Sequence, residues 1–133
     1  MISTTSIADS PIYERGGGQI SHMLLTEGQF GSRNLTVTWV EGSPGSQQDL
    51  HAHADSEQVY VIIRGRGVMV IEGEEQEVTT GTAVFIPKGA RHAIRNARDE
   101  LLVYISVTSP PFAAAFDGET WVSLDMPEAS SGG

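Results

Sequence analysis

Residues 45–65 read GSQQDLHAHADSEQVYVIIRG, and this stretch carries both a strand signal and a chemical signal. Its second half, from Gln58 to Ile63, is rich in the β-branched and aromatic residues that are typical of strands. Its first half holds His51 and His53, separated by one residue. Side chains two positions apart on a strand share a face and lie about 6 to 7 Å apart along the backbone. The two imidazoles are therefore predicted to point toward one place.

Similar short runs occur on both sides of this stretch, and clusters of Gly, Pro, Asn or Asp separate most of them. No long window shows helical periodicity and no internal repeat is present. The runs are HMLLTE, LTVTWVE, QVYVIIR, GVMVIEG, EEQEV, AVFIP, HAIRN and LLVYISVT. A spacing of about ten residues per strand predicts an all-β sandwich or barrel rather than an alternating βαβ fold.

Composition narrows the classes of function. A chain of 133 residues has the length of one domain with one hydrophobic core. Seventeen acidic and eight basic residues give a net charge of −9, which argues against a nucleic-acid partner and against an anionic membrane surface. Cysteine is absent, so disulfides and thiol chemistry are excluded, and nitrogen and oxygen atoms must hold any metal.

The two ends of the chain differ from its middle. Residues 1–18 are rich in Ser and Thr and end in three glycines, which predicts an arm that is flexible or ordered only by a partner. Residues 19–126 are the predicted domain, and residues 127–133 a disordered tail. The N-terminus lacks a basic segment followed by an apolar run, and no stretch approaches the roughly 20 apolar residues of a membrane span. We expect a cytoplasmic protein.

The run from Gln58 to Ile63 is apolar on both faces, although a strand on the outside of a small barrel normally alternates with polar residues. If Gln58, Tyr60 and Ile62 point inward, the outward residues need a second covering surface. A homodimer interface is the simplest source of that cover, and a loop or the N-terminal arm is the alternative.

A third histidine, His92, lies about 40 residues after the HxH pair. An HxH pair alone is often two exposed polar residues. A third imidazole from a distant strand, with an acid or amide from the strand after the pair, would complete a metal site with open positions for water or substrate.

Two spacings carry a family resemblance. Gly45-(x5)-His51-x-His53-(x4)-Gln58-(x6)-Gly65 resembles the first cupin motif, and Gly81-(x5)-Pro87-x-Gly89-(x2)-His92-(x3)-Asn96 resembles the second. The resemblance covers residues from about 33 to 107. It implies a small single-domain cupin of the RmlC-like superfamily, a jelly-roll or double-stranded β-helix barrel of two antiparallel sheets. The 15 residues between the two motifs are similar to the short gap of compact bacterial cupins.

The resemblance implies a metal held by His51, His53, His92 and a fourth residue that is usually Glu. Counting back from Gly65 puts Gln58 at that position, whereas counting three residues on from His53 puts Glu57 there. Strand parity favours Gln58, and Glu57 stays the alternative. An amide in place of a carboxylate leaves the site one unit more positive, which strengthens its Lewis acidity.

The expected cofactor is one divalent transition-metal ion, and imidazole with amide oxygen accepts Zn, Fe, Ni, Mn or Cu. The favoured function is a metalloenzyme that uses the ion as a Lewis acid on a small carbonyl or hydroxy substrate, as an isomerase, lyase or cyclase. A ferrous dioxygenase and a non-enzymatic binding or sensor cupin are the alternatives. Tyr60 is the candidate proton donor. The equally weighted alternative is that Tyr60 is a core tyrosine whose hydroxyl is hydrogen-bonded within the protein.

Overall fold

The computed structural model describes residues 1–111, 114–116 and 121–123, and its regular structure is almost entirely β-strand. The elements are β1 (Ile12–Gly16), β2 (Gln19–Leu25), the 3-10 turn η1 (Gln29–Gly31), β3 (Thr36–Gly42), β4 (Glu57–Arg64), β5 (Arg66–Ile71), β6 (Glu74–Thr79), β7 (Ala83–Ile86), β8 (His92–Arg95), β9 (Leu102–Ser109), β10 (Ala114–Phe116) and β11 (Trp121–Ser123). The all-β fold predicted from the short runs is confirmed.

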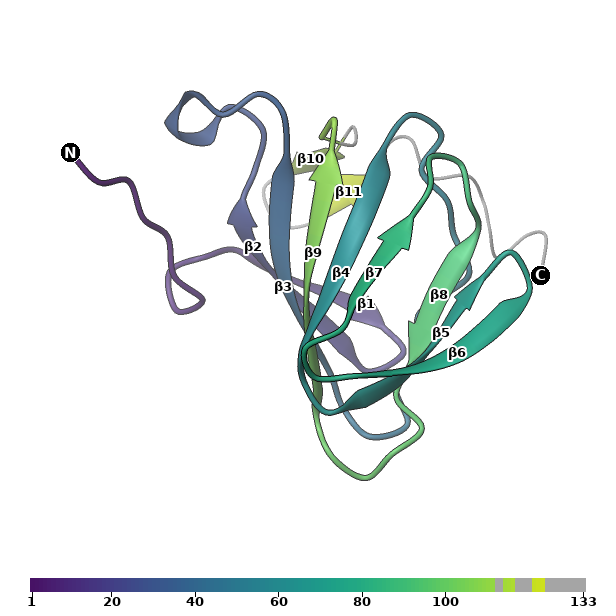
Figure 1. The fold of residues 1–133 in the computed structure, drawn as a ribbon. Coiled ribbons are helices and arrows are strands. Elements are labelled where there is room, and N and C mark those ends of the chain that lie inside the picture. The colour runs from purple at the N-terminus through teal and green to yellow at the C-terminus, as the bar shows by residue number, and fades with distance from the viewer. Residues whose placement is uncertain (112–113, 117–120, 124–133) are drawn as a thin grey trace.

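Two antiparallel sheets face each other and enclose the interior of the barrel (Figure 1). The larger sheet has the strand order β1-β2-β3-β9-β4-β7, and the smaller has the order β6-β5-β8. Gly65 joins the two sheets between β4 and β5. Its φ of +84° and the nearby carbonyl of Leu101 leave no place for a side chain, which explains why glycine ends this strand.

Strand β4 has one buried face and one partly exposed face. Gln58, Tyr60 and Ile62 are buried inside the barrel, as strand parity predicts. On the opposite face Val59 and Val61 are half-buried, and Ile63 is 37% exposed.

The interior has an apolar part and a polar part. The apolar core between the sheets consists of Val40, Tyr60, Ile62, Met69, Val78, Ile86, Ala90, Ile94, Leu102 and Tyr104. Around Gln58 the inward positions of the larger sheet instead carry hydroxyls, because Thr36 faces Thr108 and Thr38 faces Ser106 across β3 and β9. Polar side chains thus gather at the end of the barrel where β4 begins.

The chain before β1 extends away from the two sheets (Figure 1). Residues 12–16 of the expected N-terminal arm form the edge strand β1, which pairs with β2. The expected tail at residues 127–133 lies outside the described residues, and the domain limits stay predictions. Among the described residues, no helix has the length and apolar character needed to cross a membrane.

Candidate metal centre

Three histidines meet inside the barrel. His51 and His53 lie in the connection between β3 and β4, and His92 is the first residue of β8. Each is 4% exposed or less, and one ring nitrogen from each lies within 4.8 Å of the others. The structure thus brings together the two histidine groups that are far apart in the sequence, in a buried cluster suited to a metal ion.

Backbone pairing explains how His51 reaches His92. The amide of His51 donates to the carbonyl of His92 at 3.0 Å, and the amide of His92 donates to the carbonyl of His51 at 2.8 Å. This reciprocal pair is an isolated bridge, so the regular strand predicted around the HxH pair is not formed. The same two segments are also joined by the carbonyl of His53, which accepts a hydrogen bond from the amide of Gly89 at 2.9 Å.

Backbone carbonyls orient two of the imidazole rings. Nδ1 of His51 lies 2.7 Å from the carbonyl oxygen of Asp49, and Nδ1 of His92 lies 2.9 Å from that of Ala90. A carbonyl only accepts, so Nδ1 carries the proton in each neutral ring and Nε2 keeps its lone pair. Such an outer hydrogen bond is the usual support of a metal-binding histidine.

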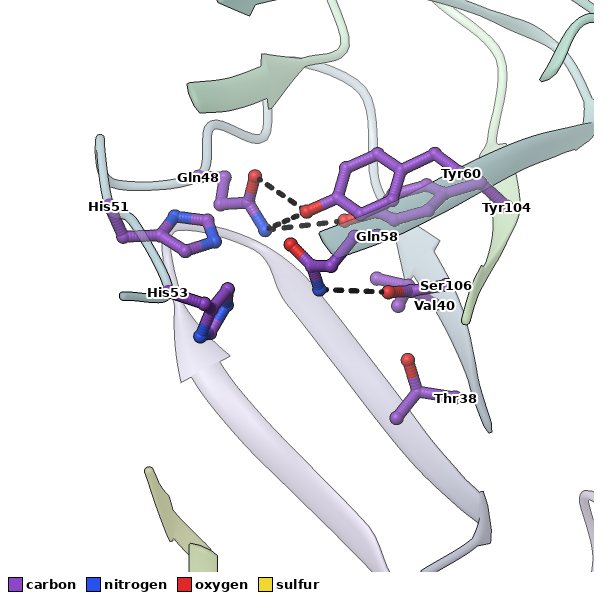
Figure 2. A pocket seen from close by; sticks show the side chains of 9 residues that line it. All are labelled: Thr38, Val40, Gln48, His51, His53, Gln58, Tyr60, Tyr104 and Ser106. Carbon is purple, nitrogen blue, oxygen red and sulfur yellow. Dashed lines mark hydrogen bonds between the residues drawn. The ribbon is translucent and has the colours of Figure 1, made fainter. Parts of the chain in front are cut away.

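The amide of Gln58 is held from its nitrogen side. Nε2 donates to Oγ1 of Thr108 at 2.9 Å and to Oγ of Ser106 at 3.3 Å. The carbonyl oxygen Oε1 lies on the side of His51 (Figure 2), is buried, and accepts no hydrogen bond from a described residue. A buried carbonyl without a donor beside three imidazoles fits a metal ligand. The alternative residue, Glu57, is exposed at the start of β4.

A small cavity of about 20 Å³ opens beside these side chains (Figure 2). Its lining consists of Thr38, Val40, Gln48, His51, His53, Gln58, Tyr60, Tyr104 and Ser106. The lining holds no Asp, Glu, Lys or Arg. The candidate proton donor Tyr60 is one of these residues, so the structure places it beside the histidines.

Gln48 organises the wall of the cavity that contains both tyrosines. Its Oε1 accepts from the backbone amide of Ile94 at 3.2 Å, which fixes the orientation of the side chain because a backbone N–H only donates. Its Nε2 therefore faces the hydroxyls of Tyr60 and Tyr104, at 3.3 and 3.5 Å. The hydroxyl of Tyr104 donates to Oε1 of Gln19 at 3.2 Å. This wall is hydrogen-bonded and uncharged.

Sequence reasoning missed Gln48 and the inward hydroxyls. Gln48 lies in the variable stretch between Gly45 and His51, where nothing in the sequence distinguishes it from Gln47. The hydroxyls did leave a signal, because Thr36 and Thr38, like Ser106 and Thr108, alternate with apolar residues at the period of a strand.

The sequence is similar to several curated proteins. The chain is 34% identical over 76 residues to an uncharacterized protein of Aquifex aeolicus, a match that covers 57% of this chain and 59% of that one. It is 30% identical over 95 residues to the tetracenomycin polyketide synthase protein TcmJ of Streptomyces glaucescens, covering 71% and 61%. The matches to these two proteins and to an uncharacterized protein of Methanocaldococcus jannaschii span between 55% and 61% of the length of those relatives.

Solved structures share the fold. A predicted oxalate decarboxylase from Thermotoga maritima superimposes with a TM-score of 0.73 at 22% identity, covering 81% of this chain and 99% of that one. An RmlC-like cupin from Shewanella frigidimarina has a TM-score of 0.69 at 21% identity, covering 83% and 92%. The polyketide cyclase RemF from Streptomyces resistomycificus has a TM-score of 0.70 at 21% identity, covering 97% and 89%.

The expected jelly-roll barrel of two antiparallel sheets is therefore confirmed. The family model described as a cupin domain matches residues 38–108, which hold both histidine groups and the strands around them. On this match, the chain belongs to the cupin family.

Proposed function

We propose that this cupin binds one divalent transition-metal ion through His51, His53, His92 and Gln58, and that it is an enzyme of the isomerase, lyase or cyclase type. The observation that carries the proposal is the buried Oε1 of Gln58, which accepts no hydrogen bond from a described residue although its amide nitrogen is bound twice. Three imidazoles and one amide are neutral ligands, and they suit Zn, Fe, Ni, Mn or Cu.

A metal ion at this place would supply Lewis acidity, which polarises a carbonyl or stabilises the charge of an enolate. The residues of the chain itself hold the proton donor in position and supply the proton for the substrate. Gln48 donates to the Tyr60 hydroxyl at 3.3 Å and so holds the phenol at the cavity wall. We assign Tyr60 as the group that donates a hydrogen bond or a proton to the substrate oxygen.

The printed names of two similar proteins support chemistry on a carbonyl compound. TcmJ is named as a polyketide synthase protein, and RemF, which shares the fold, is named as a polyketide cyclase. The substrate proposed for this chain is a small carbonyl or hydroxy compound. A Tyr60→Phe variant should lower turnover about 100-fold, a usual effect of losing a general acid, with its metal content unchanged.

The test is to load the protein separately with Zn and with Fe(II), measure bound metal, and assay conversion and O₂ uptake with diketones, flavonols and unsaturated uronates. We expect conversion without O₂ uptake. Oxygen uptake with the Fe(II) form would make the protein a dioxygenase instead, and metal binding without any conversion would make it a binding or sensor cupin. Failure of both forms to hold metal would remove the proposal.

We also propose that the protein is a homodimer formed through the outer face of the larger sheet. Val59 on β4 lies directly opposite Phe85 on β7 and Val107 on β9 in the strand register. Phe85 is 55% exposed and Ile63 is 37% exposed, so apolar side chains line an open sheet face. A second copy of this face would remove that surface from water.

A further inference from the structure

A second cavity lies between two strand edges, apart from the candidate metal centre. Strand β7 ends the larger sheet and β6 ends the smaller one, so within the described residues the outer edge of each has no neighbouring strand. The two strands diverge from residues 80–82, which connect them (Figure 1). A groove of about 280 Å³ opens between them, and it shares no lining residue with the cavity beside the histidines.

The floor of this groove is the edge of the barrel core. Met69 and Val78 are 3% exposed and belong to the core, and Ile71 and Val84 are half-buried against it. All four residues line the groove. An apolar side chain placed on this floor would leave water and extend the packing between the two sheets.

The rim of the groove carries an acidic side chain, that of Glu74. Strand alternation places Glu74 and Gln76 on the same face of β6 as the buried Val78, and all three line the groove. The neighbouring acid, Glu75, is paired with Arg95 at 3.2 Å, whereas Glu74 has no ion pair among the described residues. The lining holds no Lys, Arg or His, so the charge of Glu74 is not offset within the groove.

We propose that the groove binds an extended segment of a partner protein, which adds to the outer edge of β6 as an antiparallel strand. An unpaired strand edge offers its N–H and C=O groups to such a segment. Side chains directly opposite each other on paired strands interact, and opposite charges stabilise the pair. The segment therefore needs an apolar residue opposite Val78 and, four positions later on the same face, a Lys or Arg opposite Glu74.

The charge of the groove favours a different protein over a second copy of this chain. Residues 1–14 and 99–133 contain no Lys or Arg, so neither end of another copy supplies the basic residue. The surface also differs from the one proposed for the homodimer. On β7 the alternation directs Val84 toward the floor of the groove and Phe85 toward the outer face of the sheet, at the rim of the groove.

The test titrates the 133-residue protein with two fluorescein-labelled peptides and measures fluorescence anisotropy. One peptide is Thr-Val-Thr-Thr-Thr-Lys-Thr, and the other has Glu in place of Lys. Salt at about 0.15 M screens charges beyond about 8 Å. We expect the Lys peptide to bind at least about fivefold more tightly than the Glu peptide. Replacing its Val by Ser should weaken binding about tenfold, because the apolar contact with the floor is lost.

Two charge-swap variants locate the site. Glu74→Lys should reverse the preference, so that the Glu peptide binds more tightly than the Lys peptide. Glu77→Lys makes the same change of charge on the outward face of the same strand, and it should keep the preference for the Lys peptide. Both positions are exposed, so both variants should fold. If Glu74→Lys does not fold, Glu74→Gln should abolish the preference instead.

Three results would overturn the proposal. Equal affinity for the two peptides, or an effect of Glu77→Lys as large as that of Glu74→Lys, would mean that the net charge of the protein explains any binding. No binding of the Lys peptide at about 1 mM would remove the site. Full displacement of the Lys peptide by an equal concentration of butylamine would make the groove a site for a small amine and not for an added strand.

Discussion

The two faces of β4 reverse the usual arrangement of a small barrel. Its inward face begins with the amide of Gln58 and the phenol of Tyr60, both buried beside the histidines. Its outward face carries Val59, Val61 and Ile63, which are half-buried or exposed. A barrel strand normally has apolar residues inside and polar residues outside.

The difference indicates two separate binding tasks. Polar groups inside a barrel are tolerated where they are hydrogen-bonded or where they bind something, and here they surround the candidate metal centre. Apolar groups on an open sheet face are typical of an interface. On this basis we propose that the inner face binds a metal and a small molecule and that the outer face binds a second copy of the chain.

The largest effect is expected at the inner face from His92→Ala. Loss of one of three imidazole ligands should reduce zinc affinity by at least about 100-fold, because even outer-shell losses cost 10- to 100-fold. Metal analysis after dialysis and the rise of Tm on adding zinc both report it. His22→Ala, a change to a histidine outside the cluster, is the control and should keep the metal.

A difference in stability is expected between alanine variants of Ile62 and Ile63, which are neighbours on β4. Ile62 is 1% exposed and Ile63 is 37% exposed, so Ile62→Ala should lower the free energy of unfolding by about 2 to 5 kcal/mol and Ile63→Ala by much less. Urea unfolding of the two variants measures the difference. Equal losses would show that the outer face is as well packed as the core.

The outer face is tested by Phe85→Lys. Phe85 is an exposed apolar side chain of this face, so a charge there should convert the proposed dimer, with twice the chain mass of 14.2 kDa, into a monomer. Light scattering after gel filtration gives the mass directly. Thr80→Lys places the same charge on an exposed turn and should not change it. A wild-type protein that is already monomeric would contradict the assignment of this face.

A smaller effect is expected behind the site, from Thr108→Val. The substitution keeps the shape but removes the hydroxyl that accepts from Gln58 at 2.9 Å, so the amide is held less firmly. Zinc affinity should fall by about tenfold, as for other residues that orient a metal ligand. A titration against a chelator of known affinity measures the change. An unaltered affinity would mean that Gln58 needs no support or does not bind the metal.

The smallest effect is expected far from both faces, at the exposed pair of Arg95 and Glu75. Hydrogen bonding and charge from Arg95 lower the pKa of Glu75 below its usual value. The pair therefore stabilises the fold above the unfolded pKa of the carboxyl and loses this effect as pH falls through the folded pKa. Glu75→Gln should lower Tm slightly at pH 7 and not at acidic pH, and high salt should reduce the difference.

Much of this arrangement could be predicted from the sequence. The strand runs indicated the all-β fold, because strand periodicity and turns act locally. The resemblance of the Gly and His spacing to the two cupin motifs implied the barrel and the grouping of His51, His53 and His92. The bridge that replaces a strand at His51 could not be predicted, since it depends on pairing with β8, far along the chain. The role of Gln48 likewise depends on a distant backbone amide, that of Ile94.

Strand β1 shows the same limit. It ends at the first of the three glycines and its residues resemble the rest of a flexible arm, so only pairing with β2 makes them a strand. The inward hydroxyls of β3 and β9 were visible as Ser and Thr at alternate positions, but such residues are equally common on exposed faces, so their position inside the barrel needed the structure.

The central claim is that Gln58, and not its neighbour Glu57, completes a metal centre with the three histidines. Zinc affinity of Gln58→Ala and Glu57→Ala, measured side by side with the wild type, tests it most directly. The buried amide oxygen of Gln58 and the exposed position of Glu57 predict a loss of at least about tenfold for Gln58→Ala and none for Glu57→Ala. A loss of zinc affinity in Glu57→Ala alone, or no loss in either variant, would contradict the account.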